Sequence, residues 1–121
     1  MKRIYLFFIG LLVWGEILAQ QLVKVGDGYS STSVNTTVFR NSSLVTDGEV
    51  QYISYYDADG YLTVGKRTLG TTDWTLQRSQ YKGNVADAHN VISMMVDGDG
   101  YLHLSFDHHG NKLNYCKSTA P

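Results

Sequence analysis

A short motif occurs twice in this chain and limits the folds that the chain can adopt. The stretch YYDADGYLTV begins at Tyr55, and MVDGDGYLHL begins 40 residues later at Met95; both contain Asp-x-Asp-Gly-Tyr-Leu. In each copy a Gly- and Asp-rich turn separates two β-rich runs, which is the pattern of a β-hairpin. The hairpins are expected over residues 90–97 and 100–107 and over their counterparts 40 residues earlier. A repeat of this length is typical of propeller blades or solenoid units.

The segment after the first copy favours blades over other repeats. DWTLQRSQY, which begins at Asp73, could supply a further strand. Three or four short antiparallel strands in about 40 residues are typical of a propeller blade. The run VISMMV is apolar with a single Ser, as expected for a strand buried on both faces between blades. We therefore predict an all-β fold of the β-propeller type.

The beginning of the chain has the pattern of a signal peptide. Lys2 and Arg3 precede residues 4–18, which are apolar apart from Glu16, and Ala19 is a plausible last residue before cleavage. The apolar run is short for a membrane span, although an uncleaved anchor is the alternative. We expect residues 1–19 to be a signal peptide and residues 20–121 to be the N-terminal part of a propeller domain. The mature protein would be secreted or periplasmic, with no stable membrane span.

Charge and cysteine content argue against a nucleic-acid-binding protein and against an internal disulfide. The chain carries 10 basic and 11 acidic residues, so it lacks the positive charge that nucleic acid binding requires. Cys116 is the single cysteine and cannot form an internal disulfide. It is expected to pack as a small apolar side chain.

The two Asp-x-Asp-Gly tetrads have a calcium interpretation and a turn interpretation. An EF-hand loop requires a Glu at its twelfth position, where this chain has Thr68 in the first copy and His108 in the second. Because Asp and Gly tolerate the backbone angles of tight turns, we expect turns at both places.

All four histidines of the chain lie between Asp87 and His109. With a two-residue loop at 98–99, His89 would face His108; with the loop at 99–100, it would lie beside His109. Either register brings His89 to this pair at the open end of the hairpin, since cross-strand neighbours are about 5 Å apart at Cβ.

The first repeat serves as a control for this cluster. The residues 40 positions before His89, His108 and His109 are Glu49, Thr68 and Leu69, so the scaffold repeats without the imidazoles. This favours a functional site, and hydrogen-bonded loop histidines are the alternative.

The remaining polar residues of the stretch have structural or supporting interpretations. His103, in mid-strand, is expected to be structural. Asp87 and Asp107 could fix the imidazole tautomers. A zinc site formed by His89, Asp107 and either His108 or His109 is a competing hypothesis. The two adjacent histidines would point to opposite faces if the strand continued, and no motif such as H-E-x-x-H is present, so we predict neither a metal nor a cofactor.

Three stretches resemble the start of the BNR-4 family of secreted bacterial proteins: SVNTTVFRNSSLVT, VQYISYYDADGYLTVGKRTLG and YKGNVADAHNVISMMVDGDGYLHLSFDHHGNKLNYCKS. The similarity covers roughly Gly28 to Ser118, and Asp-Ala-His-Asn and Asp-His-His are its most specific elements. The Ser-x-Asp-x-Gly-x-x-x-Trp box of sialidase-type repeats is not intact, since GTTDW at Gly70 matches only its end.

The resemblance implies a function and roles for particular residues. Ulvan lyases and similar polysaccharide lyases of this group have a seven-bladed propeller and cleave uronic-acid-containing chains by β-elimination. His89 matches the histidine of the family's Asp-x-His-Asn element, and His109, with His108 as fallback, matches the second active-site histidine. His89 and His109 are therefore the predicted catalytic residues, and Asn90 and His108 are the predicted substrate-binding residues.

The resemblance also implies that the site needs more than this chain. Family enzymes use a Tyr and an Arg from later blades, so the chain is expected to be an N-terminal fragment with about the first two blades, inactive alone. Three functions stay open: a lyase acting on an acidic polysaccharide, a carbohydrate-binding propeller without catalysis, and a glycoside hydrolase. A hydrolase would require a pair of carboxylates, and Asp87 and Asp107 are the available ones.

Overall fold

The computed structural model describes residues 21–38 and 40–121, so the predicted signal peptide lies outside the described residues. Every regular element in this part of the chain is a β-strand, as the sequence predicts. The strands are β1 (Leu44–Asp47), β2 (Val50–Tyr56), β3 (Tyr61–Thr68), β4 (Thr75–Lys82), β5 (Ile92–Val96), β6 (Leu102–Phe106) and β7 (Asn114–Lys117).

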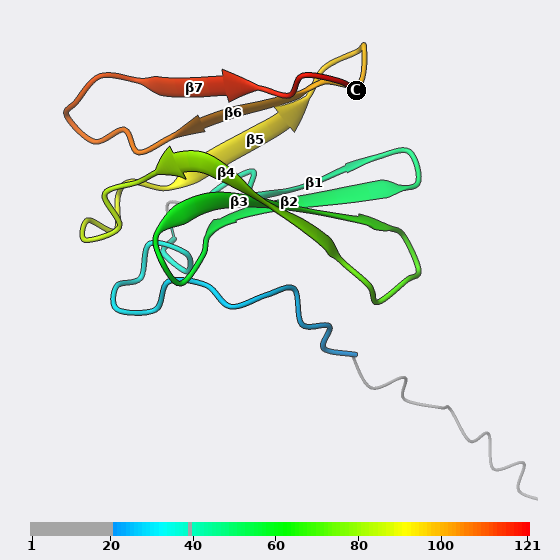
Figure 1. Ribbon diagram of the computed structural model, residues 1–121, viewed down its shortest axis with the longest axis horizontal. Coiled ribbons are helices and arrows are strands. Elements are labelled where there is room, and N and C mark those ends of the chain that lie inside the picture. The colour runs from blue at the N-terminus through cyan, green and yellow to red at the C-terminus, as the bar shows by residue number, and fades with distance from the viewer. Residues whose placement is uncertain (1–20, 39) are drawn as a thin grey trace, which may run out of the picture.

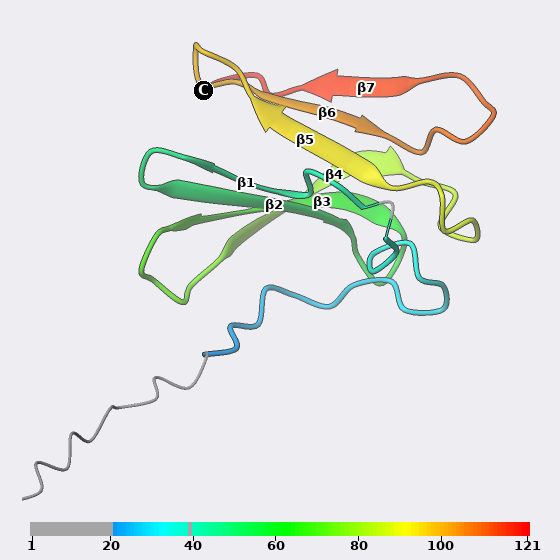
Figure 2. The same ribbon diagram turned by 180° about the vertical axis from the view of Figure 1, so that it is seen from behind.

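The strands form two antiparallel sheets that lie one above the other (Figures 1 and 2). The first has the order β1-β2-β3-β4 and the second the order β5-β6-β7. Both predicted hairpins are confirmed as β2–β3 and β5–β6, and the segment after the first hairpin forms β4 as expected. Among the described residues no helix has the length and apolar character to span a membrane.

The core lies between the sheets and draws on both of them. Tyr56 and Leu62 from the first sheet, and Ile92 from the second, are each at most 1% exposed. Burial of such side chains contributes roughly 1.5–3 kcal/mol each to folding. Their shared cluster fixes one sheet against the other and so fixes the loops at the sheet ends.

The turn of the second hairpin has three residues, so both two-residue loops considered from the sequence are wrong. The amide of Asp97 donates to the carbonyl of Tyr101 at 2.9 Å, and Gly100 adopts a φ of 86°. A type I turn followed by a left-handed glycine explains this geometry. Facing residues therefore differ by one position from both expected registers, and Met94 pairs with Leu104.

The first hairpin has the same turn, with Gly60 at a φ of 82°. In both turns the leading aspartate caps the loop. Oδ1 of Asp57 accepts hydrogen bonds from the amides of Asp59 and Tyr61, each at 3.0 Å. Oδ1 of Asp97 accepts from the corresponding amides two and four residues later. The Asp-x-Asp-Gly motif is thus a self-capped turn, as predicted.

The second hairpin is shorter than the first at the end away from its turn. The β2–β3 ladder extends to the pair Val50–Thr68, whereas the β5–β6 ladder stops at Ile92–Phe106. Residues 84–87, which correspond by the repeat to β1, form turns instead of a strand. The second hairpin therefore ends in two loops, residues 83–91 and 107–113, which carry His89 and His109.

Candidate functional site

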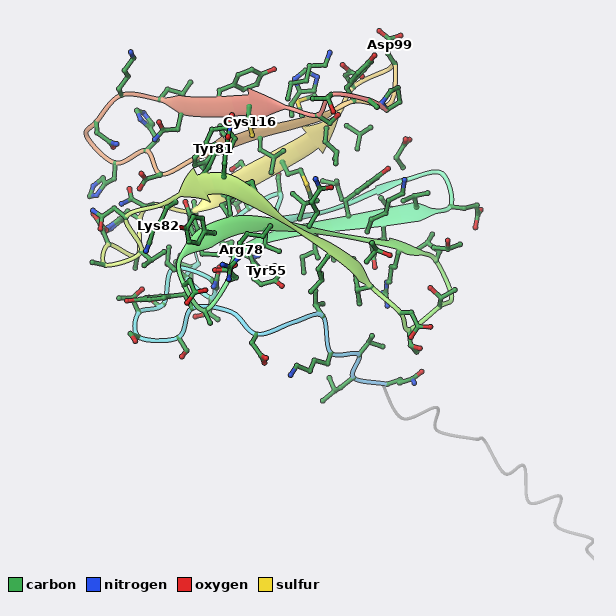
Figure 3. All side chains as sticks on the ribbon, viewed as in Figure 1. Tyr55, Arg78, Tyr81, Lys82, Asp99 and Cys116 are labelled. Carbon is green, nitrogen blue, oxygen red and sulfur yellow. The ribbon has the colours of Figure 1, made fainter. Side chains whose placement is uncertain are left out.

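His89 and His109 meet where the second hairpin opens into its loops. Their ring centroids are 4.3 Å apart, and the ring planes are inclined by 33°. The site lies at the opposite end of the hairpin from Asp99, which marks the tip of the β5–β6 turn (Figure 3). The three-residue turn explains the choice of partner, because it sets His89 opposite His109 and not opposite His108.

Asp87 joins the two imidazoles with one carboxylate. Its Oδ1 lies 2.8 Å from Nδ1 of His89, and its Oδ2 lies 2.7 Å from Nδ1 of His109. The backbone amide of His89 also donates to Oδ1 at 2.9 Å. We call these three residues the Asp87 clip. When Nδ1 of an imidazole donates to a carboxylate, Nε2 becomes the basic ring nitrogen.

The clip is partly open to solvent. The side chains of His89 and His109 are 50% and 52% exposed, and that of Asp87 is 35% exposed. The hydrogen bond from His109, supported by the amide and ring of His89, holds the pKa of the Asp87 carboxyl well below its usual range. Asp87 therefore stays ionised, while both imidazoles remain accessible to a molecule from outside.

Contacts from the first part of the chain hold the loop that carries the clip. Oγ1 of Thr32 donates to the carbonyl of Val85 at 2.6 Å, and the Tyr56 hydroxyl donates to the carbonyl of Asn90 at 2.8 Å. Gly83 packs directly on the Tyr56 ring, where a Cβ would lie only 2.4 Å from a ring carbon. The loop is therefore positioned by the neighbouring sheet and not by its own sequence alone.

A second set of hydrogen bonds closes the loop onto the end of β6. The amide of Asn84 donates to Oδ1 of Asp107 at 2.9 Å, and Nδ2 of Asn90 donates to the carbonyl of Asn84 at 3.0 Å. Asp107 therefore ties the two loops together. The expectation that Asp87 could orient the imidazoles agrees with this geometry, whereas Asp107 contacts backbone instead.

The two predicted substrate-binding residues have different surroundings. Asn90 is 4% exposed and directs its amide nitrogen into the loop, while its Oδ1 is buried and has no hydrogen-bond partner among the described residues. His108 is exposed, next to His109. Asn90 thus supports the loop in this structure, and a role for either residue in substrate binding stays a prediction.

His103 lies in β6, in mid-strand as the sequence predicts, and its side chain contacts the turn of the second hairpin. Its Nε2 lies 2.7 Å from Oδ2 of Asp97, and its Nδ1 lies 2.7 Å from the Tyr115 hydroxyl. Lys117 also contacts Asp97, with Nζ 3.2 Å from Oδ2. The hydrogen bond from His103 and that from the Tyr101 amide keep the pKa of the Asp97 carboxyl well below its usual range.

The structure changes the set of residues that could hold a metal. Among the described residues, the group with ligand atoms close together is Asp87, His89 and His109, whose atoms lie within 4.8 Å of one another. The sequence hypothesis had Asp107 as the carboxylate and left His108 and His109 as alternatives. Sequence reasoning named Asp87 and Asp107 alike as carboxylates that could orient the imidazoles, but it left Asp87 out of the metal hypothesis, because the position of Asp87 depends on the fold of the 83–91 loop.

Comparison with known families agrees with the all-β fold. The sequence profile of the BNR repeat-containing family matches residues 50–121, from the start of β2 through β7. The chain belongs to the BNR repeat-containing family. Membership indicates a carbohydrate-related, often secreted protein, and the matched region includes both hairpins and the Asp87 clip. No curated protein gave a significant match to the chain.

Proposed function

We propose that this chain is part of a secreted polysaccharide lyase that cleaves a uronic-acid-containing polysaccharide by β-elimination. Membership of the BNR repeat-containing family supports the carbohydrate substrate and the export. The resemblance of Asp-Ala-His-Asn and Asp-His-His to the ulvan lyase-type elements supports the reaction class. We assign the chain to a β-propeller, with the two packed sheets as blades, and the protein to the cell exterior or the periplasm.

The observation that carries the proposal is the Asp87 clip itself. In β-elimination a base removes the proton α to the uronate carboxylate. The bond to the oxygen on the neighbouring carbon then breaks, and a proton is delivered to that oxygen. An imidazole held through Nδ1 by a carboxylate presents a basic Nε2 in a fixed direction. Asp87 holds both His89 and His109 in this way.

The charges of the clip allow its two imidazoles to have different roles. One carboxylate balances one imidazolium, and two imidazolium rings with centroids 4.3 Å apart repel each other. Two roles can therefore be divided between the rings of the clip. A neutral ring can accept the α proton, and a protonated ring can pair with the uronate carboxylate, whose negative charge grows in the transition state.

The test is elimination by the full-length protein on uronic-acid-containing polysaccharides, followed by the ultraviolet absorbance of the unsaturated uronide. We expect His89→Ala to lower the rate by about 10²–10⁴-fold, which is typical for loss of a proton-transfer group. His103→Ala is the matched control, because it removes an imidazole of the same hairpin that contacts Asp97 and Tyr115.

The outcomes separate the three classes of function. Near-wild-type elimination by His89→Ala would show that the catalytic assignment is wrong. Binding of the polysaccharide without any unsaturated product would favour a carbohydrate-binding propeller. Cleavage that yields only saturated ends would indicate a glycoside hydrolase, whose carboxylate pair would have to be found among residues other than the clip.

A further inference from the structure

We propose that Asp87, His89 and His109 bind one divalent transition-metal ion of the zinc type. Two imidazoles and one carboxylate are a common set of protein ligands for zinc, and three protein ligands leave one position for water or another molecule. Their ligand atoms lie within 4.8 Å of one another and come from both loops at the open end of the second hairpin.

The distances require only small adjustments of the clip: ligand atoms as much as 4.8 Å apart would approach one another, and the two hydrogen-bonded oxygen–nitrogen pairs would lengthen slightly. Two ligands at about 2.0–2.1 Å from a tetrahedral Zn²⁺ are about 3.3 Å apart. The Asp87 oxygens already lie 2.8 Å and 2.7 Å from the two Nδ1 atoms. Since both imidazoles are half-exposed, they can turn to admit an ion between the three groups without opening the core.

Hydrogen bonds hold in place the two loops that carry the clip. Asp107 ties Asn84 of the first loop to the second, and Asn111 and Asn114 donate to the Asp107 carbonyl at 3.0 and 3.1 Å. Oδ1 of Asn111 also accepts a hydrogen bond from the His109 amide at 2.7 Å. The backbone on both sides of the site is therefore held before an ion arrives, which lowers the entropy lost on binding.

The ion would change the chemistry of the imidazoles. Coordination through Nδ1 moves the ring proton of a neutral imidazole to Nε2, so the ring can no longer accept a proton there. The binding site does not depend on the lyase activity, whereas this effect on elimination rests on the proposed function. In a lyase, bound Zn²⁺ would be an inhibitor.

The experiment uses the full-length protein without a polyhistidine tag. Zn²⁺ binding is measured by calorimetry, and Co²⁺ is used in parallel because its visible absorption reports tetrahedral nitrogen and oxygen ligands. We expect one site, and we expect His89→Ala, His109→Ala and Asp87→Ala each to weaken it by at least about 10–100-fold, since even groups that only support ligands have effects of that size. His108→Ala is the matched control, because it removes the adjacent exposed imidazole of the same loop, and it should retain the affinity.

A measurement on the unaltered protein tests the proposal even if the variants fail to fold. In a ¹⁵N spectrum of the imidazoles, Zn²⁺ should shift the ring signals of His89 and His109 and leave those of His103 in place. The proposal is overturned if neither ion binds, if His108→Ala weakens binding as much as His89→Ala, or if the shifted rings are other histidines. Zinc binding without elimination would reject the lyase alone, and elimination that depends on His89 without zinc binding would reject the metal site alone.

Discussion

The two hairpins of this chain have the same turn and the same register but different open ends. In the first hairpin the amide of Leu69 donates to the carbonyl of Glu49 at 2.8 Å, so the ladder continues to the adjoining β1–β2 turn. In the second, the corresponding positions are His109 and His89, and the strands have already ended. One end is a regular sheet edge, and the other is a pair of loops that brings together two imidazoles and a carboxylate.

The difference shows how a repeated scaffold can carry a site in one copy only. The pairing of residues is set by the turn and is therefore common to both hairpins. The shorter ladder of the second hairpin frees the backbone of residues 84–87 from strand pairing, and Asp87 can turn toward both rings. A functional site on loops above a rigid hairpin is a common arrangement in proteins.

The aspartates of the two turns show a second, smaller difference. Oδ2 of Asp57 contacts Nε of Arg78 at 2.5 Å and Oγ1 of Thr63 at 3.3 Å. Oδ2 of Asp97 contacts Lys117 and His103, and His103 is the counterpart of Thr63 in the repeat. Each aspartate has a basic residue from the strand that follows its hairpin, β4 or β7, so the turn is part of the scaffold in both copies.

The largest effect is expected from making the second hairpin like the first at its open end. The double variant His89→Glu with His109→Leu places the first hairpin's residues at the two positions. We expect elimination to fall by at least about 10²–10⁴-fold with the β fold retained, because the proton-transfer groups are lost while the scaffold residues remain. The rate of elimination on a uronate polysaccharide measures the loss of activity, and the far-ultraviolet circular dichroism spectrum checks that the β fold is retained. The reverse exchange, Glu49→His with Leu69→His, should leave the activity unchanged; a rate that survives the first exchange would contradict the assignment.

A smaller loss is expected when only the link between the rings is removed. Asp87→Asn replaces the carboxylate with an amide, which has only one oxygen and cannot accept a hydrogen bond from both Nδ1 atoms in the same way. The two rings therefore lose their common orientation. The rate of elimination should fall by about 10–100-fold, as is typical for loss of groups that orient functional histidines. The pH profile of elimination should also change shape, which loss of structure alone would not cause. Asp47→Asn, at the equivalent position of the first hairpin, is the control, and an equal loss there would remove the distinction between the two ends.

The smallest effect concerns the two turn aspartates and acid stability. Burial opposes ionisation of Asp57, but the amides of Tyr61 and Asp59 together with Arg78 lower its pKa overall, and the pKa of Asp97 is also lowered. An unfolded aspartate has a pKa of about 3.9, so the unfolded chain binds more protons near that pH. Both carboxylates therefore stabilise the fold above about pH 5, and this contribution is lost as the pH falls through their lower folded-state values.

Unfolding by denaturant between about pH 2 and pH 7 measures this contribution. Asp57→Asn and Asp97→Asn should each flatten the fall in the free energy of unfolding at acidic pH. If only one of them does so, the two turns are not equivalent in their electrostatics, and the similarity of the hairpins is limited to the backbone.

Several features of the fold follow from the sequence because they depend on local interactions. The Asp-x-Asp-Gly-Tyr-Leu repeat predicted both hairpins, and the composition of the following segment predicted β4. The self-capping of Asp57 and Asp97 involves residues at most four positions apart, so turn chemistry was sufficient to anticipate it. The approach of His89 to the His108–His109 pair also followed, since any tight turn near Asp99 brings these positions together.

The details of the site depend on contacts that no local pattern contains. The three-residue turn shifted the register by one position and selected His109 as the partner of His89. The choice of Asp87 over Asp107 as the shared carboxylate required the 83–91 loop to be held by Tyr56 and Thr32, which lie more than 30 residues away in the chain. Local sequence was sufficient to predict the repeat, the hairpins and the histidine-rich end. The choice of side chains that form the clip depends on tertiary contacts, because packing between the two sheets sets the path of the loop that carries Asp87.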